Sequence, residues 1–479
     1  MSGSVSSNQP TPAQDVAKIH GLLSDNGFLG HDENDHLHQV SKLLSGLNSS
    51  DLHQVLTGLS QGDLKKLGSE IDDGGTPVFG GLIGNNGLSS GERQSLFNQL
   101  ASHSTNGMDL ARLSGDLSSR DDIQGLGNAI AAHATDATKL GYISGMAPST
   151  TQQNDANNFG FGYSTSTTGS PQANAVGSVL ASLKGHAVDQ ALGSLNDQQL
   201  GAVMKAAEGE TLTTTSDGFG AATTVSYDTT KLAAINSAAA SGSDPAQKAR
   251  VFETDAKALK DINGSNTLFT PDPTAKDEAH HVADAMTGLL KSDTTGVVNA
   301  LNNADESGHA ATTYAKEMIS EGRTSDVGNI IARLQQGDDL SHNPIDFVNT
   351  QVKNPYGQDY YQNAENLGYF TGAVEAGINQ ITSDQNAQGN LLSNIFTTVV
   401  SAGASWAGPE GKAAAQVVNG LTRQAIAGVV SSLASGDKSL RDSINDLSLP
   451  RDPKTHERYR GPADPYFMSS QSTVIEQNS

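Results

Sequence analysis

Apolar residues recur at helical spacing along most of the chain, in short runs separated by small polar residues. Residues 15–73 contain such runs, for example Leu52, Val55, Leu56 and Leu59. This spacing of three and four places the side chains on one face of a helix. Residues 88–148 continue the pattern, and Ser89 with Glu92 has the form of a capping box. Helices this short are marginal alone in water. We therefore expect a mainly α fold, a multi-helix array of short amphipathic helical hairpins.

Two Thr-rich segments interrupt the helical pattern in the middle of the chain. Residues 157–169 and 210–228 alternate in polarity, and the second contains Asp217-Gly218, a dipeptide typical of hairpin turns. Both contain Gly-Phe-Gly, which tight turns explain, because no GxGxxG or GxxxxGK[ST] pattern accompanies it. We expect one or two small β-hairpin insertions.

Breaks in the pattern divide the chain into predicted regions. Asp244-Pro245 predicts a helix start, with an acidic N-cap followed by proline at the first helical position. The expected regions are a disordered leader (1–14), an N-terminal helical subdomain (15–73), a Gly-rich linker (74–87), a helical domain with small β-hairpins (88–262), a C-terminal helical domain (274–447) and an irregular tail (448–479).

Residues 385–433 form the most uniformly uncharged part of the predicted C-terminal domain. No charged residue lies between Asp384 and Glu410. One interpretation is a helical hairpin, around Trp406, that inserts into membranes. Ser, Thr, Asn and Gln interrupt both arms, however, so neither reaches the ~20 predominantly apolar residues of a membrane span. A buried hairpin is favoured, in which small residues allow its helices to approach closely: Gly403, Ala404, Gly420 and Gly428.

The composition adds a constraint on the core. Apolar residues make up 35% of the chain and aromatic residues 5%, against roughly 45–50% apolar, glycine included, in ordinary globular domains. The 51 glycines bring the chain close to that share. We therefore expect a core of Ala, Leu, Val and Gly, with helices in close approach.

The charge balance restricts the partners. The chain carries 29 Lys and Arg against 52 Asp and Glu, a net charge of −23. This acidity repels phosphate backbones, so we expect no nucleic-acid partner, and it also disfavours anionic membrane surfaces. A local basic patch occurs near the end of the chain: Arg451, Lys454, Arg458 and Arg460.

The absence of cysteine excludes several kinds of chemistry. A chain with none has no thiolate nucleophile, no cysteine-ligated metal and no disulfide. Residues 1–14 lack the cationic and apolar regions of a Sec-type signal peptide, and no acidic residue precedes Asp15. Such a start is similar to the export leaders that bacterial needle-type secretion machines, as in type III secretion, recognise. A cysteine-free chain also suits passage between reducing and oxidising compartments.

Two clusters contain metal-ligating residue types. In residues 276–284, Asp277 with His281 and His280 with Asp284 have i,i+4 spacing, but the HExxH order is missing. The other cluster is predicted to be an exposed loop, because it lacks the EF-hand order: His31, Asp32, Glu33, Asp35, His36 and His38. Solvated charges explain both clusters, and no GxSxG pattern occurs. The sequence therefore assigns no catalytic, cofactor-binding or metal-binding residue.

Several segments resemble a helical region of large proteobacterial proteins of secreted-toxin or effector type. They cover most of residues 88–455, and they are 88–101, 177–215, 289–344, 364–381 and 448–455. The resemblance implies a bacterial origin, a helical fold and an association with secretion, but no activity and no site residue. The acidic, cysteine-free, Gly-rich composition is also similar, more loosely, to that of harpins.

The leading hypothesis is a secreted bacterial effector or toxin-associated protein, more a binding protein than an enzyme. It would leave the cell by a Sec-independent route and act, in the host or outside the cell, through contacts with secretion machinery, a chaperone or a target protein. A first alternative is a membrane-active, translocon-associated or harpin-like protein that uses residues 385–433. A second alternative is a hydrolase whose site is assembled from distant residues.

Overall fold

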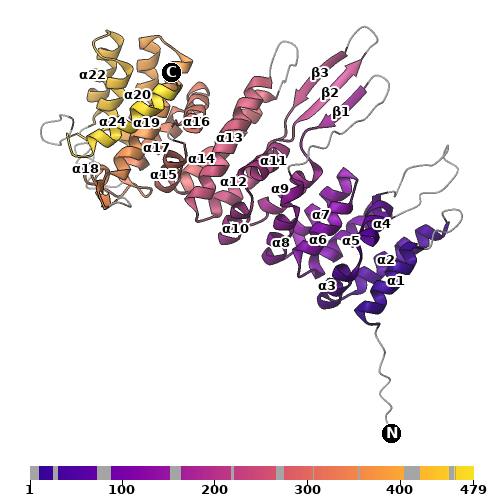
Figure 1. The fold of residues 1–479 in the computed structure, drawn as a ribbon. Helices are drawn as coiled ribbons and strands as arrows, with labels where there is room; N and C mark the ends of the chain where they lie inside the picture. Colours follow the sequence, from indigo (N-terminus) through magenta and orange to yellow (C-terminus); the bar gives the residue numbers. More distant parts are fainter. Residues whose placement is uncertain are drawn as a thin grey trace. The chain divides into compact units, whose positions relative to one another are not determined.

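Helices predominate in the structure, a computed structural model, which confirms the predicted mainly α class (Figure 1). The structure describes residues 10–24, 31–72, 88–150, 163–216, 221–265, 274–305, 307–353, 357–403, 421–451, 458 and 460–478. The predicted linker and most of the predicted leader lie outside these residues. The first helix begins at Pro12, so the end of the predicted leader is helical rather than disordered. Two compact units divide the chain, residues 1–242 and 243–479.

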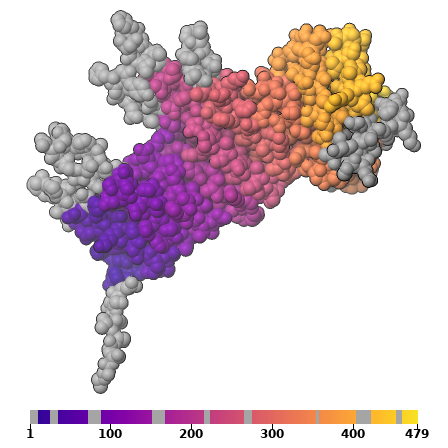
Figure 2. Space-filling model, turned by 180° about the vertical axis from the view of Figure 1, so that it is seen from behind, coloured from indigo at the N-terminus to yellow at the C-terminus, as the bar shows by residue number. Residues whose placement is uncertain are grey.

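Unit 1 is built from short helices that stack in sequence order (Figure 1). Each of several helices packs mainly on the second helix along the chain, as in the pairs α5–α7, α6–α8 and α7–α9. Figure 2 shows the result as a gradual change of colour through this unit. The helices are α1 (Pro12–Ser24), α2 (His31–Gly46), α3 (Ser49–Gly58), α4 (Gln61–Asp72), α5 (Ser90–His103), α6 (Gly107–Asp116), α7 (Arg120–His133), α8 (Asp136–Met146), α9 (Pro171–Ala181), α10 (His186–Ser194), α11 (Asp197–Ala207) and α12 (Thr230–Ser241), with a 3-10 turn at Ala147–Ser149.

Capping residues allow one helix to end and the next to begin within a few residues, which forms a tight corner between them. Helices α3, α6 and α10 each end on a buried leucine in extended backbone: Leu59, Leu117 and Leu195. The next helix then begins within a few residues, where a polar side chain such as Ser119 or Asn196 accepts a backbone N–H. The capping box predicted at Ser89 and Glu92 is present at the start of α5. Each corner therefore buries an apolar side chain and satisfies a helix end at once.

Buried aspartates in the first turns of three helices fix how those helices stack. The carboxylate of Asp63 on α4 lies 2.7 Å from Nδ1 of His20 on α1. The carboxylate of Asp109 on α6 lies 2.6 Å from Nδ1 of His53 on α3. In the third pair, Arg93 Nε on α5 lies 2.9 Å from Asp122 Oδ1 on α7. A negative charge is favoured at a helix N-terminus, so each pair joins two helices at a position where the carboxylate is already stabilised.

The two Thr-rich segments meet in one antiparallel sheet. Strand β2 (Thr211–Ser216) pairs with β3 (Ala221–Ser226) as the predicted hairpin, with Thr211 opposite Ser226. Strand β1 (Tyr163–Thr167) pairs with the other edge of β2, giving the order β1-β2-β3. The first segment thus adds a third strand instead of folding into a hairpin of its own. Asp217-Gly218 and both Gly-Phe-Gly sequences lie outside the described residues.

Unit 2 begins one helix earlier than the predicted domain boundary. Helix α13 starts at Pro245, and Asp244 Oδ1 accepts the N–H of Ala246 at 2.9 Å, as its sequence predicts. It packs on α14 and α15, so it belongs to unit 2 and not to a domain over 88–262. The elements of this unit are α13 (Pro245–Ser265), α14 (Ala275–Ser292), α15 (Thr294–Ala304), α16 (His309–Ser320), α17 (Thr324–Gln336), α18 (Pro344–Val348), β4 (Val352–Lys353), β5 (Asp359–Tyr360), α19 (Gln362–Ile381), α20 (Gln385–Gly403), α22 (Arg423–Ala434), α23 (Leu440–Ser448) and α24 (Asp464–Asn478).

Helix α19 is the central element of unit 2, because every residue from Asn366 to Ile378 is buried. Its most extensive partner is α24, which occupies much of the tail predicted to be irregular. The yellow α24 lies against the orange α19 in Figure 1. Phe467 and Val474 of α24 are fully buried. The tail is helical because α19 offers it a complementary face; its own Ser- and Gln-rich sequence shows little helical periodicity.

Glycines on α19 allow the two backbones to approach closely. A β-carbon at Gly368 would overlap the carbonyl group of Phe467, and one at Gly372 would lie 2.9 Å from the carbonyl oxygen of Gln471. Similar approaches occur at Gly107 and at Gly328, which lie against the backbones of α8 and α20. The predicted core of Ala, Leu, Val and Gly at close helix approach is confirmed.

We expect Gly368→Ala to destabilise unit 2 although alanine favours helices. The new methyl group would push α24 off α19, at a cost of about 1–3 kcal/mol for overpacking. Gly288→Ala is the matched control, since Gly288 lies in helix α14 with no atom within 4 Å of the added β-carbon. That control should gain about 0.5–1 kcal/mol. Urea denaturation followed by circular dichroism measures both values, and equal stabilities of the two variants would contradict the packing argument.

Candidate functional site

The predicted cluster at residues 276–284 lies on α14 and forms local ion pairs. His280 Nε2 is 3.5 Å from Asp284 Oδ2, and Asp284 also pairs with Arg323, which directly precedes α17. His281 contacts Glu278 at 3.7 Å instead of Asp277. Within the part of the chain that the structure describes, no group of three His, Asp or Glu side chains is placed to hold a metal ion.

The second cluster is helical, which corrects the predicted loop. Residues 31–38 form the first turns of α2, whose apolar residues Leu37, Val40 and Leu44 are buried. The side chains of residues 31–34 lie outside the description. His38 Nε2 lies 3.1 Å from Glu92 of α5. The acidic residues suit a helix N-terminus, and so the cluster has a structural explanation.

Two of the four basic residues near the chain end make internal contacts. Arg451 donates to the carbonyl oxygen of Asp446 at 3.0 Å, and Arg458 pairs with Asp464 at 2.7 Å. Arg460 is exposed, and Lys454 lies outside the described residues. Arg451 thus contacts α23 and Arg458 contacts α24, and the backbones of these two arginines pair in an isolated antiparallel bridge.

The weakly charged segment 385–433 contains two helices that pack on each other, α20 and α22. Helix α20 also packs on α17. Of the small residues predicted to make this contact, Ala404 and Gly420 lie outside the described residues, and so do the surroundings of Gly403. An added β-carbon at Gly428 would meet nothing within 4 Å, whereas one at Gly389 would lie 3.0 Å from Val430. Residues 404–420, with Trp406, lie outside the description. Among the described helices, none has both the length and the apolar character of a membrane span.

A small cavity in unit 2 is lined by a histidine and a carboxylate that both contact a nearby serine. Its volume is about 200 Å³, and its lining includes Asp305 and His309. The Ser307 hydroxyl contacts both Asp305 Oδ1 and His309 Nδ1. Serine therefore lies between the other two groups, whereas in a hydrolytic triad the histidine lies between serine and the acid. This order does not supply an activated nucleophile.

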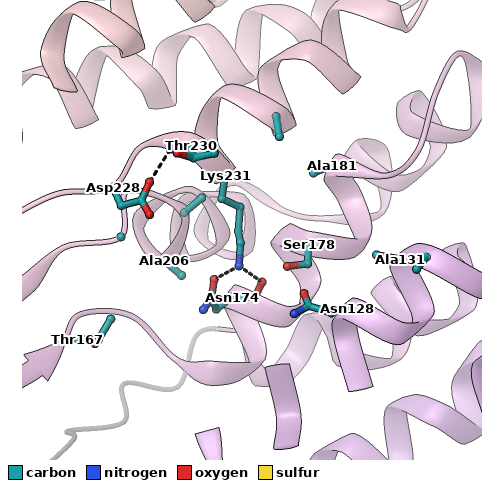
Figure 3. Close-up of a pocket in the computed structure, with 14 residues that line it drawn as sticks. Asn128, Ala131, Thr167, Asn174, Ser178, Ala181, Ala206, Asp228, Thr230 and Lys231 are labelled. Carbon is teal, nitrogen blue, oxygen red and sulfur yellow. Dashed lines mark hydrogen bonds between the residues drawn. The ribbon is translucent and has the colours of Figure 1, made fainter. Parts of the chain in front are cut away.

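A larger concave site, in unit 1, was not anticipated from the sequence (Figure 3). It is a cavity of about 650 Å³ where helices α7, α9, α11 and α12 meet the end of β1. Its apolar wall consists of six alanines: Ala131, Ala132, Ala181, Ala206, Ala207 and Ala234. Small side chains leave space between these helices that leucine would fill.

Lys231 is the one cation that lines this cavity among the described residues. Its Nζ donates to the backbone oxygen of Asn174 at 3.3 Å and to Asn174 Oδ1 (Figure 3). Burial lowers the pKa of Lys231 from 10.5 to about 8, although the nearby Asp228 carboxylate acts in the opposite direction. Asp228 itself accepts the N–H of Thr230 at 3.2 Å, and the hydrogen bonds from the Thr230 hydroxyl and N–H hold the pKa of Asp228 below its ordinary value.

A second hydrogen-bond group borders the cavity beside Lys231. Gln124 Nε2 donates to Asn128 Oδ1 at 2.7 Å and to Ser178 Oγ at 2.8 Å. The side chains of Asn128, Asn174 and Ser178 thus use an oxygen as acceptor within the protein. A single lysine in the segment KLAAINSAAAS gave no signal of this site, because its neighbours come from helices about 50 and 100 residues earlier.

The comparisons with known proteins leave the sequence resemblance untested. No family model, curated protein or solved structure matches the chain.

Glu375 is a buried carboxyl group at the centre of unit 2. It is 4% exposed on α19; Oε1 lies 3.5 Å from Nε of Arg441, and Oε2 has no hydrogen-bond partner. Burial raises the pKa of Glu375 from 4.5 to about 7, and the attraction of Arg441 only partly offsets this rise.

Glu375 makes the stability of unit 2 depend on pH in a defined direction. Between pH 4.5 and 7 the native state holds this proton and the unfolded state does not, so stability falls as the pH rises. We expect Glu375→Gln to remove this component and to raise the free energy of unfolding at pH 8 by roughly 1–3 kcal/mol. The exposed Glu476→Gln is the control. Denaturation curves at pH 5, 6, 7 and 8 measure the effect, and an unchanged slope in the Glu375 variant would contradict it.

Proposed function

We propose that this chain is a secreted bacterial effector or toxin-associated protein that acts through protein contacts. It leaves the cell by a Sec-independent route, and its partners are the secretion machinery, a chaperone or a target protein. The observation that carries the protein-contact role is the stacking of short helices in unit 1, in which α5 packs on α7, α6 on α8 and α7 on α9. Repeated stacking of this kind produces the extended surfaces that helical-repeat proteins use to bind other proteins.

The charge and the corners of unit 1 support the same role. A net charge of −23 keeps such a chain soluble and directs it away from polyanions. The caps at the starts of α5, α7 and α11 satisfy these helix ends internally. Side chains on the outer helix faces are thereby left for intermolecular contacts. The export part of the proposal rests on the leader-like residues 1–14 and the missing cysteines.

Export is tested by deleting residues 2–9 in a bacterial host with a needle-type secretion system. This deletion spares Thr11, whose hydroxyl caps α1 by accepting the N–H of Gln14. We expect the variant to accumulate inside the cell, with an unchanged melting temperature, while the full chain appears in the medium. A variant with residues 2–9 in shuffled order separates composition from sequence. Secretion of the deletion variant at the full-length level would contradict the export proposal.

The contact role is tested at Met108 on α6, whose side chain is 48% exposed, the largest value among the exposed large apolar residues described. Exposed apolar anchors contribute strongly to protein interfaces when they become buried. We expect Met108→Glu to reduce the partner recovered with the tagged chain after cross-linking in producing or recipient cells to less than a tenth, while Met108→Leu retains it. Quantitative mass spectrometry provides the readout. A chain that cross-links to no protein in either cell type would contradict the contact role.

A further inference from the structure

We propose that the alanine-walled cavity around Lys231 binds a small organic carboxylate, independently of the protein contacts proposed above. The cavity has a volume of about 650 Å³, which lies within the range of small-molecule sites. Like such sites, it combines an apolar wall with a few polar groups placed on one side. Figure 3 shows Lys231, Asn174, Ser178 and Asn128 gathered there from three helices.

The hydrogen-bond donors that remain free around the cavity specify the ligand's polar group. Asn174 Oδ1 accepts from Lys231, and both Asn128 Oδ1 and Ser178 Oγ accept from Gln124. The amide NH₂ groups of both asparagines, the Ser178 hydroxyl hydrogen and the third ammonium hydrogen of Lys231 remain as donors. A cluster of donors beside one cation fits a group with two acceptor oxygens and a negative charge.

The alanine wall and the Asp228 carboxylate specify the rest of the ligand. Six alanines present only methyl groups, so the body of the ligand is short and apolar. Asp228 also lines the cavity, but its carboxylate is turned to the Thr230 N–H, away from Lys231 (Figure 3). Two sources share the required chemistry, a simple carboxylic acid such as hexanoate and a zwitterionic amino acid such as leucine. Only the amino acid would use Asp228 as a partner for its ammonium group.

Calorimetric titration of the full chain with hexanoate and with leucine tests the proposal. We expect at least one of them to bind with a dissociation constant below 1 mM. Lys231→Met should weaken that binding at least tenfold, because the carboxylate loses its counter-ion. Lys184→Met is the matched control, since Lys184 is an exposed lysine of unit 1 outside the cavity lining. Asp228→Asn should weaken leucine binding and leave or improve hexanoate binding.

A second measurement keeps the test valid where the Lys231 variant fails to fold. In wild-type protein with ¹³C-labelled alanine methyl groups, the ligand should shift the signals of the six lining alanines and not that of Ala249 in unit 2. The proposal is overturned if neither hexanoate nor leucine binds at 10 mM, if folded Lys231→Met binds as wild type does, or if the shifted alanines lie elsewhere.

Discussion

The close approach of helix backbones at glycine is the constraint on which this structure depends. The chain has few aromatic side chains, so it cannot fill wide gaps between helices. Gly107, Gly328 and Gly368 instead let a neighbouring helix pack directly on the backbone. Short distances allow alanine, leucine and valine to make dense contacts, and each atom pair contributes only about 0.1–0.2 kcal/mol. The high glycine content therefore allows a chain with a low apolar share to form a densely packed core.

The buried carboxyl groups differ in the partners that surround them. The buried Asp63, Asp109 and Asp122 each lie at a helix N-terminus and have a cationic or histidine partner on a neighbouring helix. For Asp63, burial alone would raise the pKa, but hydrogen bonds from Ser60 and His20 together lower it below its ordinary value. Glu375 is buried in the middle of α19 beside Arg441, and burial raises its pKa. The hydrogen bonds that a carboxyl group receives, as much as its burial, decide which of its forms is favoured.

The candidate site shows which features the local sequence predicts and which it does not. The helices that surround the Lys231 cavity, the capping box at Ser89 and the α13 start at Asp244-Pro245 all follow from short-range patterns. The cavity itself does not, because it requires Asn128, Asn174 and Lys231 to meet from three separate helices. In the sequence the lining alanines are ordinary helix formers, and only the packed helices show that they leave the space of the cavity. The acidic and histidine-rich clusters that the sequence does display are helix-end and surface charges.

The sequence by itself determined the mainly α class, most of the helices, the β2–β3 hairpin and the close-packed Gly-Ala core, because these depend on periodicity, capping and composition within a few residues. Tertiary structure alone decided that β1 joins the hairpin, that α13 belongs to unit 2 and that residues 464–478 fold as α24. In each case contacts with segments distant in the sequence decide the outcome, and local preference does not. Helix α24 is the clearest example. Its own sequence does not predict a helix, and the glycine face of α19, about 100 residues earlier, supplies the packing that stabilises it.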